Sequence, residues 1–152
     1  MKRFLKKAFA LMVVAALLCF ACYIFWPHRF DMLQPDCDSI TVFRIDTADD
    51  FSQTIRQESY CADSAEFEQI MEILSRYTYH RSFRTLVRAN NMEDNRAGYW
   101  LRVYLDRGDD RVCFTCGGTS EVSIDGLVWR IGYLENRSSL AMMKELSDIL
   151  EQ

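Results

Sequence analysis

The sequence has little of what enzyme active sites usually need. Its 152 residues include only two histidines and six glycines. A catalytic imidazole would have to come from His80, since His28 follows the apolar N-terminal segment directly, and no neighbouring residue marks His80 as a base. Gly117-Gly118 cannot form a phosphate-binding loop, because neither a lysine nor a helical pattern follows it. We therefore expect a protein that is not an enzyme and that holds neither a metal nor a cofactor.

Positive charge is also scarce beyond the N-terminus. Four of the 18 lysines and arginines precede residue 8, which leaves 14 cations against 22 acids and a net charge of −8 for the rest of the chain. This acidic balance argues against nucleic acid as a partner, because nucleic-acid binding needs a basic surface. Lys144 is the only lysine among those 14 cations, and arginine binds carboxylates and phosphates in a forked geometry that lysine lacks.

One long apolar run, Ala8–Trp26, is free of charge over nineteen residues. As a helix it would be about 28 Å long, close to the hydrocarbon thickness of a bilayer. The residues before it are basic, which predicts a cytoplasmic N-terminus and an extracytoplasmic C-terminal part. We therefore expect a single-pass protein of the cell membrane. Its predicted parts are a basic start (1–7), a transmembrane anchor (8–26), a stalk (27–38) and one extracytoplasmic domain (39–152).

Two other interpretations of the N-terminus remain open. A cleaved signal peptide would need a small-x-small site, for which Cys19-Phe20-Ala21 is the nearest match. A bacterial lipoprotein would carry its lipid on Cys22, although Cys19 stands where such signals normally have leucine. An uncleaved anchor accounts for the whole apolar run.

Two segments of the domain show helical periodicity. Asp63 is a candidate N-cap with Glu66 three residues later, and the apolar stripe that follows predicts a helix over residues 64–77. A second helix is expected to begin near residues 136–138. Its predicted apolar stripe consists of Leu140, Met142, Met143, Leu146, Ser147, Ile149 and Leu150.

The rest of the domain alternates like strands. "SITVFRI" (39–45) is the first expected strand, and residues 46–62 are polar and predicted to be irregular, with one helical turn near Phe51. Further strands are expected at 80–88, 98–106, 111–116, 120–124 and 127–133, with Asp125-Gly126 as a hairpin turn. The predicted fold is α+β: an antiparallel meander with two helices packed on one face, in the order strand, helix, four or five strands, helix.

"RVCFTCGG" (111–118) contains a Cys-x-x-Cys motif. In a strand, Cys113 and Cys116 would be about 10 Å apart and on opposite faces, too far for a disulfide. A redox site would need a following helix, and a zinc site would need two more ligands. Cys37 and Cys61 are the candidates for a disulfide that would staple the segment between them, the alternative being that all these thiols are free.

Strand alternation also separates a core face from a second face. Tyr99, Leu101, Val103 and Leu105 belong to the core face. The opposite parity carries aromatic residues interleaved with arginines, which are typical of interaction surfaces. The candidate binding residues are Arg84, Arg88, Trp100, Arg102, Tyr104 and Arg130, with Thr115 beside them. A solvated face, on which arginines simply lie along rings, is the alternative.

The chain resembles small single-span or lipoprotein-like envelope proteins of Gram-positive bacteria, many of which contain a domain of unknown function. The resemblance is carried by the basic start, the apolar segment, "DSITV" (38–42), "IDGLVWRIG" (124–132) and the terminal helix. It implies location rather than activity. The leading hypothesis is a membrane-anchored binding or regulatory module whose partner is an envelope protein, a wall polymer or a lipid head group. A thiol redox or zinc protein centred on Cys113 and Cys116 is one alternative, and a structural subunit of a membrane complex is another.

Overall fold

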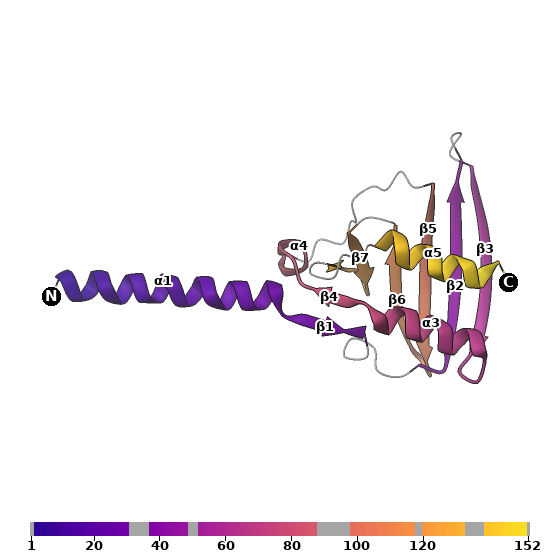
Figure 1. Cartoon of the computed structure of the whole chain (residues 1–152), viewed down its shortest axis with the longest axis horizontal. Coiled ribbons are helices and arrows are strands. Elements are labelled where there is room, and N and C mark those ends of the chain that lie inside the picture. Colours follow the sequence, from indigo (N-terminus) through magenta and orange to yellow (C-terminus); the bar gives the residue numbers. More distant parts are fainter. Residues whose placement is uncertain are drawn as a thin grey trace.

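An α+β architecture is present in the computed structural model of the protein, which describes residues 2–30, 37–48, 52–87, 98–117, 120–132 and 139–151. These residues form four helices and eight strands (Figure 1). The helices are α1 (Lys2–Phe25), α3 (Ala65–Arg76), α4 (Phe83–Leu86) and α5 (Ser139–Leu150). The strands are β1 (Pro27–Arg29), β2 (Ser39–Thr47), β3 (Gln53–Cys61), β4 (Thr78–His80), β5 (Tyr99–Arg107), β6 (Asp110–Cys116), β7 (Glu121–Ile124) and β8 (Leu127–Ile131).

All eight strands belong to one antiparallel sheet in the order β1-β4-β8-β7-β6-β5-β2-β3. Strands β5 to β8 form the expected meander, in which each strand pairs with the next along the chain. The hairpin of β2 and β3 adds to β5, so β3 becomes the edge strand at one side. Asp125 and Gly126 turn between β7 and β8 with positive φ angles of 48° and 76°, the geometry that an Asp-Gly hairpin turn needs.

Helices α3 and α5 lie across the same face of the sheet (Figure 1). We call this the helix-covered face, and its side chains form the hydrophobic core together with Ile70 and Leu74 of α3 and Met143 and Leu146 of α5. The N-cap of α3 is Ser64, whose Oγ accepts a hydrogen bond from the Phe67 N–H at 3.2 Å, so the Asp63 cap was misplaced by one residue. Within α5 the expected stripe is buried except for Leu140, which is 50% exposed.

Two predicted segments have a different structure. Residues 53–61 form strand β3, not irregular chain, and pair with β2 along their full length. Residue 51 and the expected helical turn around it lie outside the described residues. The single strand expected at 80–88 is also wrong: β4 ends at His80, and the helix α4 follows after two residues, because Ser82 and Thr85 form a capping box that starts a helix.

The segment expected as a stalk (27–38) begins as part of the sheet. Pro27–Arg29 is strand β1 and pairs with β4 at the edge of the sheet. His28 stacks edge-on against Trp129 with ring centroids 5.2 Å apart, and Phe30 is fully buried in the core. Only Trp26 separates the last residue of α1 from the sheet. The domain is therefore joined to α1 by a very short connection.

Helix α1 is long and apolar enough to cross a membrane, from Arg3 to Phe25. Its side chains face outward along most of its length, and large apolar residues such as Phe4 and Leu11 are 76% and 72% exposed. It extends away from the sheet, as the indigo helix at the left of Figure 1 shows. An exposed apolar helix of this length is suited to a lipid environment.

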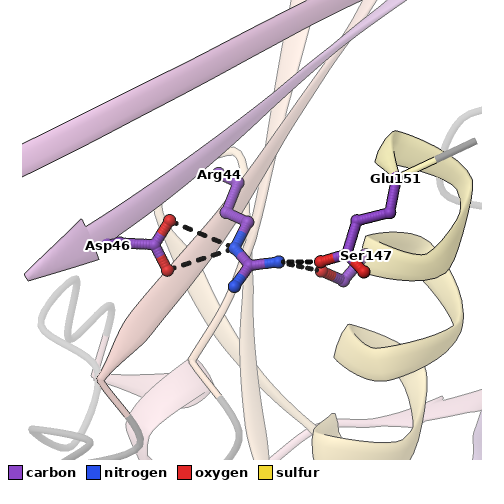
Figure 2. Close-up of polar contacts among 4 residues, drawn as sticks. All are labelled: Arg44, Asp46, Ser147 and Glu151. Carbon is purple, nitrogen blue, oxygen red and sulfur yellow. Dashed lines mark hydrogen bonds and ion pairs between the residues drawn. The ribbon is translucent and has the colours of Figure 1, made fainter.

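A polar cluster ties α5 to the sheet. The Arg44 guanidinium of β2 donates to Ser147 Oγ of α5 and to Oε1 of Glu151, the residue after this helix, both at 2.7 Å, and to the Asp46 carboxylate at 3.1 Å (Figure 2). It also lies 4.6 Å from the centre of the Tyr99 ring. Because these partners come from two strands and the end of α5, Arg44 holds the C-terminal helix in position over the sheet.

Candidate functional site

The side of the sheet opposite α3 and α5, which we call the open face, is hollowed over β2, β3, β5, β6 and β7. The hollow has a volume of about 660 Å³, within the range of small-molecule binding sites. It is lined by Ile45, Gln53, Ile55, Trp100, Arg102, Cys113, Thr115, Ser123 and Gly126. No carboxylate and no imidazole is among these lining residues, so the part of the lining that the structure describes offers binding groups but no conventional general base.

Two rows of side chains cross this hollow. Strand pairing places Ile55, Ile45 and Trp100 side by side in one row, which is apolar. The next row contains Arg102, Thr115 and Ser123, which is polar and carries one positive charge. A ligand lying across the strands would therefore meet an apolar surface along one side and hydrogen-bonding groups along the other.

Arg102 is the charged group of the hollow. Its side chain is exposed, and among the described residues it has neither an ion-pair nor a hydrogen-bond partner. By contrast, Arg44, Arg76 and Arg111 each contact a carboxylate within 3.2 Å. A guanidinium with no acid beside it keeps its forked donors available for a carboxylate or phosphate from outside the protein.

Trp100 owes its position to a glycine. A Cβ atom added at Gly117 would overlap the Trp100 ring, with ring atoms Cε3 and Cη2 only 2.7 Å and 3.0 Å from it. The ring therefore lies directly on the Gly117 backbone, an approach that only glycine permits. This contact explains the first glycine of "RVCFTCGG": it follows the strand and supports an aromatic side chain on the open face.

Tyr104 shares the open face but is engaged by its neighbours. Its ring packs edge-on against Phe43, with centroids 5.4 Å apart, and the Arg111 guanidinium lies 5.1 Å from its centre. Arg111 in turn donates to the Asp106 carboxylate at 2.5 Å. Tyr104 does not line the hollow. At this position the open face is a solvated surface on which an arginine lies along an aromatic ring, which was the alternative to a binding site.

The other predicted binding residues are not part of the hollow. Arg84 belongs to α4 and forms an ion pair with Glu121, a residue only 1% exposed. Arg130 is the strand partner of Glu121, and its Nε is buried with no hydrogen-bond partner among the described residues. Both lie at the β7–β8 side of the sheet. Arg88 lies outside the described residues.

The cysteines divide between the two faces. Cys116 is fully buried in the core, and this burial raises the pKa of its thiol far above the usual range. Cys113 lies on the opposite face, where it lines the hollow. Within the described chain no three histidines, cysteines or acids cluster as metal ligands would. The geometry gives no support to a redox or zinc centre built on both cysteines.

The candidate disulfide between Cys37 and Cys61 is absent from the described structure, in which neither cysteine forms a disulfide, as the alternative had it. Cys37 faces the core side, where its Sγ lies 3.9 Å from Met71 Sδ. Cys61 is exposed at the end of β3, on the same face as Ile55. The start of β2 pairs with the end of β3, so the two cysteines belong to neighbouring chain segments, but their side chains lie on opposite sides of the sheet.

Three lining residues were missed because they come from the β2–β3 hairpin: Ile45, Gln53 and Ile55. Ile55 is 60% exposed, which is unusual for a large apolar residue of a strand. This exposed apolar side chain is the one local feature of β3 that indicates a binding surface. Ser123 shares the parity of Thr115 through strand pairing and could have been assigned to the same face.

No protein-family model matches this chain, and no similar protein was found among curated proteins or among solved structures.

Proposed function

We propose that this chain is a membrane-anchored binding module, with α1 in the cell membrane and the hollow of the open face as its binding site. The observation that supports this most directly is Arg102, which has no ion-pair or hydrogen-bond partner among the described residues, inside a hollow of about 660 Å³. The envelope location and the extracytoplasmic orientation expected from the sequence are part of this proposal. Binding fits the described lining residues better than catalysis does, because they include no acid or imidazole.

The ligand we propose is an anionic group carried on an apolar body. Arg102 would bind the anion, Thr115 and Ser123 would hydrogen-bond to it, and Ile45, Ile55 and Trp100 would contact the apolar part. A peptide end and a wall stem peptide both offer this chemistry, and the hollow itself does not distinguish them.

Direct binding measurements on the full-length chain in detergent micelles test this function. Two probes cover the ligand classes: a peptide with an apolar residue and a free C-terminal carboxylate, and a wall stem peptide. We expect at least one of them to bind and Arg102→Ala to weaken its affinity by about 10- to 100-fold, the range for losing hydrogen bonds to a charged group.

The matched control is Arg107→Ala, which removes another exposed arginine from the same strand, β5, but outside the hollow. It should leave the affinity unchanged. Equal weakening by the two substitutions, or unchanged affinity with Arg102→Ala, would contradict the proposal.

A second function, a structural subunit of a membrane complex, is favoured by one observation. Strand β3 is the edge of the sheet, and eight of its nine residues are exposed. An edge strand of this kind can pair with a strand from another chain. If that is its role, the chain will assemble with its partner through β3, and assembly will survive Arg102→Ala.

A further inference from the structure

Helix α4 presents its apolar side chains to the outside of the protein. Phe83, Leu86 and Val87 are 63%, 48% and 54% exposed, whereas Ser82 and Thr85 are only 8% and 5% exposed. A helix on the surface of a water-soluble domain shows the opposite arrangement, with apolar residues inward. A cluster of three exposed large apolar side chains on one short segment indicates a surface that contacts something apolar.

This arrangement is held firmly in place. Ser82 Oγ accepts from the Thr85 N–H at 3.3 Å, and Thr85 Oγ1 accepts from the Ser82 N–H at 2.9 Å. Thr85 Oγ1 also donates to the Val128 carbonyl of β8 at 2.5 Å. The ion pair of Arg84 with the buried Glu121 adds a second link to the sheet. The polar groups of α4 thus point inward because they bond the sheet, and the apolar groups are left outside.

Helix α4 lies beside the last turn of α1. The Arg81 guanidinium, just before α4, is 4.7 Å from the centre of the Tyr23 ring of α1. A second hollow, of about 220 Å³, lies between the two elements and is lined by Ile24, Arg81, Ser82, Phe83, Arg84 and Arg130. Figure 1 shows α4 at the end of the domain nearest α1. If α1 spans a bilayer, Tyr23 and Ile24 are at its boundary, and α4 is at the same level.

The charge around this hollow also fits a membrane surface. Three arginines line it, and no acid is among its described lining residues; one of the three, Arg84, pairs with Glu121. The chain beyond the N-terminal basic residues carries a net charge of −8, so this cationic site contrasts with the rest of the domain. Lipid phosphates are the anions available at that level, and arginine binds phosphate in a forked geometry.

We propose that α4 and the hollow beside it dock on the surface of the bilayer that α1 enters. Phe83, Leu86 and Val87 insert at the boundary between head groups and acyl chains, and Arg81 and Arg130 bind lipid phosphates. This inference rests on the proposed function in one respect, since it requires α1 to be a membrane anchor. Its consequence is a fixed orientation: β2, β3 and β5, with the ligand hollow, lie at the end of the domain far from the membrane (Figure 1).

Photocrosslinking to lipid tests the docking with the full-length chain in vesicles. The photoreactive residue p-benzoylphenylalanine replaces Phe83 in one variant and Ile55 in the matched control. These two positions are 63% and 60% exposed, but Ile55 lies on β3, the strand at the opposite edge of the sheet. We expect lipid adducts, detected by mass, at position 83 and none at position 55.

Extraction of the same vesicles with alkaline carbonate separates the two proposals. A chain that resists extraction yet forms no lipid adduct at position 83 overturns the docking and leaves the anchor intact. A chain that is extracted overturns the anchor, and the docking with it. Equal adducts at positions 83 and 55 also overturn the docking, because they show that the domain has no fixed side toward the bilayer.

Lipid charge provides an independent readout. Vesicles of phosphatidylcholine alone are compared with vesicles that also contain phosphatidylglycerol. We expect the adduct yield at position 83 to be higher with phosphatidylglycerol, and Arg81→Gln to remove this increase while Arg107→Gln preserves it. An increase that Arg81→Gln does not reduce would refute the assignment of the arginines to lipid phosphates.

Discussion

Replacing Arg44 by methionine tests whether one guanidinium holds α5 on the sheet. Methionine keeps much of the apolar stem and removes the contacts to Ser147, Glu151 and Asp46 (Figure 2). Only 22% of the Arg44 side chain is exposed, whereas the side chains of Asp46 and Glu151 are 42% and 55% exposed. The two acids can therefore regain water when the arginine is removed, but Ser147, at 5% exposure, loses a partner inside the protein.

These exposures set the size of the effect. The screened ion pairs contribute roughly 0.2–1 kcal/mol each, and the buried hydrogen bond to Ser147 contributes about 1–2 kcal/mol. We expect Arg44→Met to lower the free energy of unfolding by about 2 kcal/mol. With a denaturant slope of about 2 kcal/mol/M, the urea midpoint would fall by about 1 M.

The assay is urea unfolding of the detergent-solubilised full chain, followed by tryptophan fluorescence. The matched control is Arg111→Met, because Arg111 also bonds a carboxylate and lies along a tyrosine ring, but at the surface. We expect no measurable change from the control. An unchanged midpoint in Arg44→Met, or equal losses in both variants, would refute the idea that this cluster fixes α5.

Two further substitutions have defined outcomes. Gly117→Ala should displace the Trp100 ring into the ligand hollow and so reduce probe binding. It should also lower the free energy of unfolding by about 1–3 kcal/mol, as overpacking does. If probe binding and the free energy of unfolding are both unchanged, the contact between Gly117 and Trp100 is refuted. His28→Phe should remove part of the acid sensitivity of folding. Burial, followed by the charges of Arg81 and His80, lowers the pKa of His28 below its ordinary 6.5, so the unfolded chain binds more protons than the folded chain just below pH 6.5. The free energy of unfolding of the parent chain should therefore fall as the pH falls through that window. It should fall less in His28→Phe, in which the phenyl ring still packs against Trp129. Parallel plots of the free energy of unfolding against pH for the two chains would refute this.

The elements that the sequence predicted well are those with a strong internal pattern. Helices α3 and α5 carry apolar stripes that pack on the sheet, and β5 to β8 alternate between core and open face. For these segments the local pattern and the tertiary environment agree, because one side of each element is buried. The errors at their ends, such as Ser64 in place of Asp63 as N-cap, concern the choice between adjacent capping residues.

Strand β3 could not be recognised in the same way. At the sheet edge it has no buried row, so its sequence "QTIRQESYC" lacks the apolar alternation on which strand prediction depends. Strand β1 has only three residues and forms because β4, some fifty residues later, pairs with it. Residues 80–88 were misassigned for a different reason: the Ser82–Thr85 capping box favours a helical turn over the extended chain that alternation suggested.

The candidate site, too, could be predicted from the sequence only in part. Trp100 and Arg102 could be assigned to the open face by parity within one strand. Arg130 was grouped with them because parity says nothing about distance across the sheet, and Arg84 was grouped with them because its segment was predicted to be a strand. The structure places Arg84 and Arg130 at the β7–β8 side, next to α4 and α1, and the hollow beside Ile45 and Ile55. Sequence alternation thus defines the face of a residue, whereas strand order defines its neighbours. Here strand order separates one arginine-rich face into two places, the hollow that we propose binds a ligand and the site that we propose contacts the membrane.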